Sequence, residues 1–140
     1  MIVVDTSGLL AAIDSAQRYH EAAAASLLAA EPPLLLSPFV LAELDYLIAN
    51  RVGASARAAL LSEVADGAYR LEPFGADDVA EAQLVIERHR DLGISLADAS
   101  IVVLAARHGV RDVLTLDERH FRVLMAKRRA FRLLPADARG

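Results

Sequence analysis

The sequence predicts an α/β fold with three layers, in which helices cover both faces of a five-stranded parallel sheet. Short apolar runs alternate along the chain with longer segments of helical pattern, and no hairpin turn signal joins two of the runs. This alternation is typical of parallel strands that are buried on both faces and connected by helices. The chain of 140 residues is long enough for a core of ordinary size, so we expect one domain over 1–140.

The first predicted strand covers residues 2–4, where three consecutive β-branched side chains favour an extended and buried backbone. The run ends at Asp5, and Thr6-Ser7-Gly8 after it are residue types that cap helices and turn the chain. A helical pattern follows from Leu9. Because ligands bind beyond the carboxyl ends of strands in open parallel sheets, Asp5 is a candidate site residue. The alternative is that Asp5 only caps the helix that follows.

Proline and glycine residues separate the remaining elements. Pro32-Pro33 ends one helical segment, Pro38 begins the next, and Gly53 and Gly109 end two more. We expect helices over 20–30, 39–51, 54–65, 76–90 and 95–108, strands over 34–36, 69–72, 113–115 and 131–134, and a short basic helix before the last strand.

Composition excludes several classes of protein. The chain contains no cysteine, which rules out disulfides and thiolate metal sites and leaves oxygen or histidine ligands. No apolar run reaches the roughly 18 residues needed to cross a membrane. The N-terminus has no basic segment of the kind that begins a signal peptide. We therefore expect a cytoplasmic protein with no membrane partner.

The net charge of −4 is unevenly distributed along the chain. Residues 107–140 contain nine Lys or Arg and four Asp or Glu, a net charge of +5, which leaves −9 for residues 1–106. Such a division can present acids to a metal ion and bases to an anionic substrate. Lys127 is the only lysine, and the planar guanidinium of the arginines suits bidentate contacts to phosphate.

Two acids lie within the apolar helix expected over 39–51. Glu43 and Asp45 each have apolar residues at helical spacings of three and four on both sides. An unpaired buried charge costs on the order of several kcal/mol, so each acid needs a partner or an edge that reaches solvent. The residue pattern does not choose between Glu43 and Asp45.

Two further acids follow predicted element boundaries. Asp98 completes a capping box with Ser95 at the start of a helix, a role that is compatible with facing a metal ion. Asp117 follows the fourth predicted strand and so repeats the position of Asp5. Clustered carboxylates repel one another unless a divalent cation neutralises them, and a set of oxygen ligands selects Mg²⁺ or Mn²⁺.

Four short motifs contain these acids in a fixed order along the chain. They are Asp5-Thr6-Ser7, Val40-Leu41-Ala42-Glu43-Leu44, Leu96-Ala97-Asp98-Ala99 and Thr115-Leu116-Asp117 with His120-Phe121. In order and spacing they resemble the motifs of PIN-domain nucleases. The length and layout are similar to those of VapC-type toxins of prokaryotic toxin–antitoxin pairs, and the resemblance covers essentially the whole chain.

The resemblance implies a PIN-like fold whose acids converge on Mg²⁺, or Mn²⁺ in its place, at the carboxyl edge of the sheet. It selects Glu43 over Asp45 and makes Glu43 either a metal ligand or the group that orients the attacking water. The implied catalytic residues are Asp5, Glu43, Asp98 and Asp117, with Asp5, Asp98 and Asp117 as metal ligands and Ser7 and Thr115 as supporting hydrogen-bonding residues.

The implied activity is metal-dependent hydrolysis of RNA phosphodiester bonds, in which the cation lowers the pKa of a bound water and stabilises charge on the phosphate. Arg128 and Arg129 are expected to hold the RNA backbone, a contact that carries no base preference. The resemblance also implies a homodimer and a cognate antitoxin protein as partners.

Two other functions compete with a nuclease. A phosphotransfer domain, either an aspartyl phosphatase or a receiver, would also use Asp5 with Mg²⁺. Such a phosphatase would carry a second Asp where this chain has Ser7, and both classes need a lysine after a later strand, whereas Lys127 lies in an arginine-rich stretch. A non-catalytic PIN-like binding module would be expected to lack some of the four acids. A nuclease is therefore the preferred interpretation.

Overall fold

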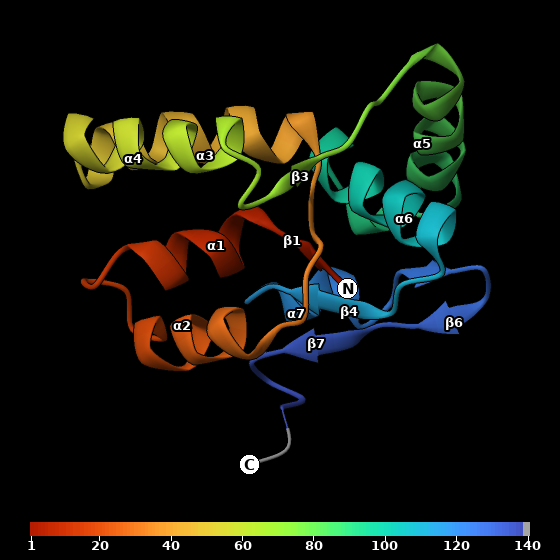
Figure 1. The fold of residues 1–140 in the computed structure, drawn as a ribbon. Coiled ribbons are helices and arrows are strands. Elements are labelled where there is room, and N and C mark those ends of the chain that lie inside the picture. Colours follow the sequence, from red (N-terminus) through yellow and green to blue (C-terminus); the bar gives the residue numbers. More distant parts are fainter. Residues whose placement is uncertain (139–140) are drawn as a thin grey trace.

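The computed structural model describes residues 1–138, and its centre is a parallel sheet of five strands in the order β3-β2-β1-β4-β7 (Figure 1). The α1–α2 pair and the α5–α6 pair pack on different sides of this sheet. The helices are α1 (Thr6–Ile13), α2 (His20–Ala29), α3 (Pro38–Arg51), α4 (Ala54–Ala65), α5 (Ala76–Arg88), α6 (Leu96–His108) and α7 (Glu118–Phe121). The strands of the sheet are β1 (Ile2–Val4), β2 (Leu34–Leu36), β3 (Arg70–Leu71), β4 (Asp112–Leu114) and β7 (Arg132–Leu134).

Strand β1 is the central strand of the sheet, as its β-branched sequence suggested. All three of its residues are buried, and Val3 pairs in parallel with Leu35 of β2 on one side and Val113 of β4 on the other. Because strands β1 and β4 are adjacent and parallel, the residues that follow them lie together at one edge of the sheet. The predicted fold class is confirmed.

Several element boundaries differ from the sequence-based expectation. Strand β3 is shorter than residues 69–72, and both of its residues are exposed at the edge of the sheet. Helix α5 ends at Arg88, and a 3₁₀ turn over Arg90–Leu92 follows it and ends at Gly93 in the left-handed conformation. These differences are small because the ends of elements depend on contacts that local patterns do not contain.

A short helix does precede the last strand, since α7 lies there with Arg119 and His120 in its last turn, but the basic residues that follow it form a hairpin and not a helix. Strands β5 (Met125–Ala126) and β6 (Arg129–Ala130) pair antiparallel. The turn consists of Lys127 and Arg128, whose φ angles of 49° and 64° are the left-handed values that a two-residue hairpin turn requires. Asn or Gly usually signals such a turn, so the sequence contains no warning of this one.

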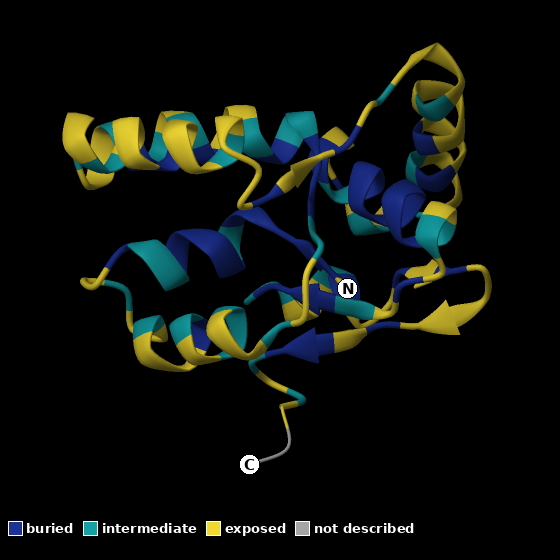
Figure 2. Cartoon of the chain, in the orientation of Figure 1, coloured by how far each residue is buried: buried dark blue, intermediate teal, exposed yellow. Residues whose placement is uncertain are grey.

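The core lies between the sheet and the helices that cover it, and Figure 2 shows its buried residues in dark blue. Helix α6 contributes an uninterrupted buried run from Ala99 to Ala105, which explains its apolar composition on all sides. Helices α3 and α4 form an arm whose outer surface is largely exposed (Figure 2). None of the helices within residues 1–138 has the length and apolar character needed to cross a membrane.

Helix α1 lies unusually close to strand β4, and this close approach requires Gly8. A Cβ atom on Gly8 would overlap the backbone carbonyl of Leu114 and lie 2.8 Å from the backbone nitrogen of Thr115. The glycine therefore places the first turn of α1 directly against the end of β4, which brings Asp5 and Thr115 together.

Candidate active site

Asp5 is a buried carboxylate held by two hydroxyl groups. The residue is only 5% exposed. Thr115 Oγ1 donates to Asp5 Oδ2 at 2.7 Å, and Ser7 Oγ donates to the same oxygen at 3.0 Å. Ser7 Oγ in turn accepts from the backbone N–H of Leu116 at 2.9 Å. The supporting roles expected of Ser7 and Thr115 thus correspond to direct contacts with Asp5, whose side chain accepts no capping hydrogen bond from α1.

The environment of Asp5 favours its neutral form. Its pKa is raised from 3.8 to about 6, chiefly because burial disfavours the charged form; the nearby charge of Asp98 acts in the same direction, and the hydrogen bonds from Thr115 and Ser7 act against it. A carboxylate with these surroundings gains from a nearby cation, because a positive charge offsets both the desolvation and the repulsion.

Asp98 and Asp117 each lie at the start of a helix, Asp98 in the first turn of α6 and Asp117 at the N-cap of α7, and both line the same cleft. The predicted capping box is present: the Asp98 N–H donates to Ser95 Oγ at 3.1 Å, and Asp98 Oδ2 accepts from the Ser95 N–H at 3.0 Å. Asp117 Oδ1 accepts from the His120 N–H at 3.0 Å and so caps α7. These hydrogen bonds fix both carboxyl groups without using all of their oxygen atoms.

His120 places an imidazole nitrogen between these two acids. Its Nδ1 lies 2.8 Å from Asp117 Oδ2, without the alignment of a hydrogen bond, and 3.6 Å from Asp98 Oδ2. One possible ligand atom from each of Asp98, Asp117 and His120 lies within 4.8 Å of the others.

The donor atoms of this cluster fit a divalent cation. Two buried side-chain polar atoms within residues 1–138 have no hydrogen-bond partner, His120 Nδ1 and Thr6 Oγ1. His120 belongs to the group with Asp98 and Asp117, and Thr6 lines the same cleft as these two acids. Carboxylate oxygens with one imidazole nitrogen are a common ligand set for divalent metal ions.

The two acids of α3 lie on different faces of the helix. Glu43 is exposed and lines the same cleft as Asp5, Asp98 and Asp117. Asp45 is turned toward α4, where its two oxygens accept from Arg57 at 2.6 and 3.0 Å. The structure therefore brings Glu43, and not Asp45, to the other predicted acids, as the family pattern had selected.

These acids share a cleft of about 310 Å³ at the carboxyl edge of the sheet. The cleft lies between α1 and α3, with the start of α6 and the segment after β4 at its acidic end. Its lining residues are Asp5, Thr6, Ser7, Leu10, Gln17, Glu43, Leu47, Arg51, Asp98, Leu116 and Asp117.

Arg128 and Arg129 do not lie in this cleft. Both are exposed on the β5–β6 hairpin, which leads directly into β7. The first residue of β7, Arg132, pairs with Asp112 at the amino end of β4, so the hairpin stands at the opposite edge of the sheet (Figure 1). Lys127 lies in the same turn, which removes the lysine that a phosphotransfer site would need beside Asp5.

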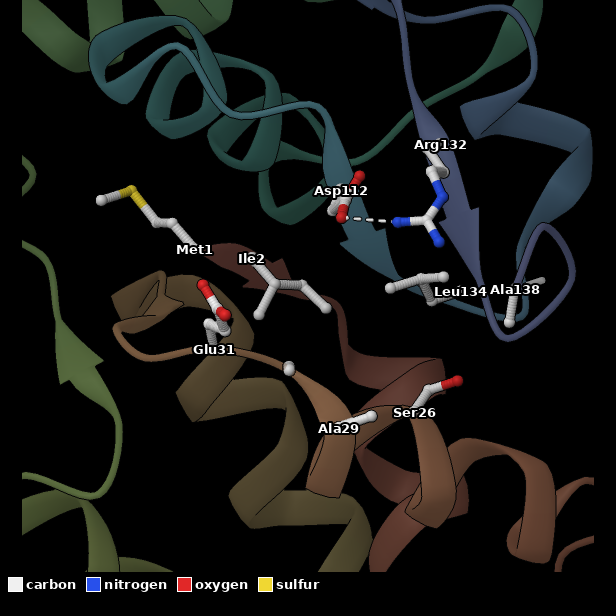
Figure 3. Close-up of a pocket in the computed structure, with 10 residues that line it drawn as sticks. Met1, Ile2, Ser26, Ala29, Glu31, Asp112, Arg132, Leu134 and Ala138 are labelled. Carbon is white, nitrogen blue, oxygen red and sulfur yellow. Dashed lines mark hydrogen bonds and ion pairs between the residues drawn. The ribbon is translucent and has the colours of Figure 1, made fainter. Parts of the chain in front are cut away.

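A second cavity, of about 340 Å³, also lies at the amino edge of the sheet. Figure 3 shows Met1, Glu31 and the pair formed by Asp112 and Arg132, whose nitrogen donates to Asp112 Oδ2 at 2.9 Å. Of the two acids that line this cavity, Asp112 is already paired with Arg132, which leaves Glu31. None of the predicted catalytic residues lines the cavity.

Sequence reasoning missed three residues of the cleft region. His120 enters the sequence analysis only as part of a motif, although its spacing of three from Asp117 is a signal of a shared site. Arg51 lies eight residues after Glu43, which places both on one face of α3. Gln17 carries no recognisable signal, because only the turn after α1 brings it to the cleft.

Comparisons with known proteins agree with this geometry. The sequence matches the PIN domain family over residues 2–126. It is 44% identical to Ribonuclease VapC26 of Mycobacterium tuberculosis over 123 residues. This alignment covers 88% of this chain and 91% of that protein.

Solved structures show the same fold. The crystal structure of VapC20 of Mycobacterium tuberculosis, a sarcin–ricin loop cleaving toxin, matches with a TM-score of 0.78 and 26% identity over 84% of this chain and 90% of that one. FitAcB from Neisseria gonorrhoeae has the same fold, with a TM-score of 0.60 and 23% identity over 84% and 88% of the two chains. The family match, the relative and the acidic cleft lead to one conclusion: this chain belongs to the PIN-domain family, in its VapC group.

Proposed function

We propose that this protein is a metal-dependent endoribonuclease and the toxin component of a toxin–antitoxin pair. The observation that carries the proposal is the single cleft in which Asp5, Glu43, Asp98 and Asp117 meet, in a chain 44% identical to a named ribonuclease. Chain segments that are far apart in sequence supply these acids, which makes independent helix caps an insufficient explanation for all four.

Asp5, Asp98 and Asp117 would hold the metal ion, with His120 Nδ1 as a further ligand. Mg²⁺ is the proposed ion and Mn²⁺ its substitute, because oxygen atoms dominate the ligand set. A divalent cation, when bound, supplies a positive charge that stabilises the phosphate and lowers the pKa of a water molecule.

The protein groups have separate tasks in this reaction. Ser7 and Thr115 hold the Asp5 carboxylate in one orientation, and the caps of α6 and α7 hold Asp98 and Asp117. Glu43 comes from the opposite wall and is exposed, so its carboxylate is free to accept a proton from the attacking water or to orient that water.

The relatives support the proposed substrate class. VapC20 is described as cleaving the sarcin–ricin loop, so a structured RNA loop is a reasonable first substrate to test. We further propose a single domain over 1–140, a cytoplasmic location, a homodimer and a cognate antitoxin. An apolar groove of about 290 Å³ between α3, α4 and β3, lined by Leu41, Leu61 and Leu71 among others, supports a protein partner on this arm.

The test is cleavage of total cellular RNA and of a sarcin–ricin loop hairpin, with Mg²⁺, with Mn²⁺ and with chelator. Glu43→Gln is nearly isosteric and should reduce cleavage by at least 100-fold, an order-of-magnitude expectation for a lost catalytic group, without a change in melting temperature.

Asp45→Asn is the matched control, since it changes a neighbouring acid of the same helix that points to Arg57 and away from the cleft. It should cut RNA at the wild-type rate. Cleavage that is independent of metal, or equal in Glu43→Gln and wild type, would contradict the proposal.

A further inference from the structure

The cleft presents an electrostatic problem for the substrate that we propose. Four carboxylates line it, and RNA is a polyanion, so the strand needs cationic partners beyond a metal ion at the acidic end. The arginines of the β5–β6 hairpin stand at the other edge of the sheet. Among the residues that line the cleft, Arg51 is the only arginine or lysine.

Arg51 lies in the last turn of α3, on the face that carries Glu43. Glu43, Leu47 and Arg51 are spaced by four residues, and all three line the cleft. Eight residues of helix separate Glu43 from Arg51 by about 12 Å along the helix axis. The cleft is therefore a groove with acids at one end and a cation at the other.

The guanidinium of Arg51 is available for a ligand. Arg51 is exposed, and within residues 1–138 no carboxylate forms an ion pair with its guanidinium. This sets it apart from Arg57 of the same arm, which Asp45 neutralises, and from Arg107, which pairs with Glu72 and Asp78.

The facing wall at this end of the groove is fixed by a turn. Asp14 is buried at the end of α1, where it accepts from the Ala16 N–H at 3.0 Å and from Gln17 Nε2 at 3.2 Å. Gln17 is thereby held at the cleft, so that an amide and a guanidinium line the end away from the acids.

We infer that Arg51 binds a backbone phosphate of the RNA strand, flanking the scissile one, and that the strand follows the groove between α1 and α3. The planar guanidinium can form two parallel hydrogen bonds to one phosphate, which fixes the strand's position as well as its charge. Arg51 is a positioning residue, because it acts at a distance from the reacting atoms. The inference rests on the proposed nuclease function.

The experiment measures binding of a single-stranded RNA to protein carrying Glu43→Gln, so that the RNA stays intact. Adding Arg51→Ala should weaken binding about tenfold, as expected for one lost charged contact. It should also reduce the slope of log affinity against log salt by about 0.7, the contribution of one phosphate contact to a single strand. Arg51→Lys should keep that slope, since it keeps the charge, while losing part of the affinity.

Cleavage kinetics and metal binding supply the second measurement. With Glu43 intact, Arg51→Ala should raise KM for a short RNA with a smaller change in kcat, and the stabilisation of the fold by Mn²⁺ should equal that of wild type. Arg88→Ala removes an exposed arginine from α5, outside the cleft, and should leave affinity, salt slope and KM unchanged.

The outcomes separate this inference from the function on which it rests. If wild type cuts RNA and the Arg51→Ala protein has wild-type affinity, salt slope and KM, the inference is wrong and the nuclease proposal stands. If wild type neither binds nor cuts RNA, both are wrong.

Discussion

Asp5 illustrates how a single buried carboxylate links the fold to the site. Its folded-state pKa of about 6 exceeds the ordinary 3.8, so the native protein binds this proton more tightly than the unfolded chain does. Stability from this group is therefore present at low pH and is lost as the pH rises from about 4 to about 6. At neutral pH the charged form costs free energy, which a bound cation would recover.

The corresponding prediction compares wild type with Asp5→Asn in the presence of chelator. Asparagine removes the titrating group and keeps an oxygen that can accept from Thr115 and Ser7. The free energy of unfolding of Asp5→Asn relative to wild type should rise between pH 4 and pH 7 by about 2 kcal/mol, which is most of the free energy equivalent to the shift from 3.8 to about 6. Urea unfolding across this range measures the difference.

A second acid with a shifted pKa, Asp137, sets the lowest pH at which the two proteins should be compared. Bonds from Arg122 and the Leu133 N–H lower the pKa of Asp137 from 3.8 to about 2, so its contribution to stability is lost only as the pH falls below 4. Working above pH 4 and taking differences between the two proteins isolates Asp5. Parallel curves of stability against pH for the two proteins would contradict the prediction.

At the scale of elements, the site depends on how closely α1 packs against β4. Ser7 of α1 and Thr115 after β4 lie 108 residues apart in sequence and 3.2 Å apart between their hydroxyl oxygens. Gly8 permits this distance, because any larger residue would meet the backbone of β4. A residue that looked like a turn former in the sequence therefore serves as a contact between two elements.

We predict that Gly8→Ala lowers the free energy of unfolding by about 1–3 kcal/mol, the usual cost of an overpacked contact. The added methyl group should push α1 away from β4, and this movement should also weaken metal binding at Asp5. Thermal melts with and without Mn²⁺ measure both effects.

Gly75→Ala is the control for this substitution, since the surroundings of Gly75 leave open space for a Cβ and its φ is −103°. It should cost less than 1 kcal/mol, as roughly expected for a change at a helix N-cap. Equal stability of the Gly8→Ala and Gly75→Ala proteins would show that α1 can move away from β4 at no cost.

For the whole molecule, the positions of the charged residues in the fold do not follow from their positions along the chain. The chain's last quarter is basic, yet the hairpin with Arg128 and Arg129 stands at the amino edge of the sheet, while the acids gather at the carboxyl edge. A role of these two arginines in RNA binding stays a prediction, and it would require a strand that extends well beyond the cleft.

Growth of cells that express the protein tests the proposed toxin function. Expression of wild type alone should arrest growth, whereas Asp98→Asn should not, because a carboxylate at the metal site is lost. Asparagine keeps an oxygen that can accept from the Ser95 N–H, so the α6 cap and the fold should persist. Equal protein levels and a normal melt of the variant are the controls, and a folded variant that still arrests growth would leave Asp98 as a helix cap.

The sequence by itself determined the fold class and the order of the four acids. The strand over residues 2–4 follows from its β-branched side chains, and the Ser95–Asp98 capping box is present as predicted. Both are local: the signal lies within a few residues of the structure that it specifies. The motifs around the acids are local in the same sense, which is why a family resemblance could be read from them.

Only the tertiary structure decided which side chains meet. The rotation of α3 about its axis, set by its packing, turns Glu43 to the cleft and Asp45 to Arg57. The placement of His120 between Asp98 and Asp117 and of Arg51 at the far end of the groove likewise depends on contacts between distant segments. The left-handed turn of the β5–β6 hairpin, formed without glycine or asparagine, is a conformation that the antiparallel pairing of β5 with β6 imposes on residues that do not favour it.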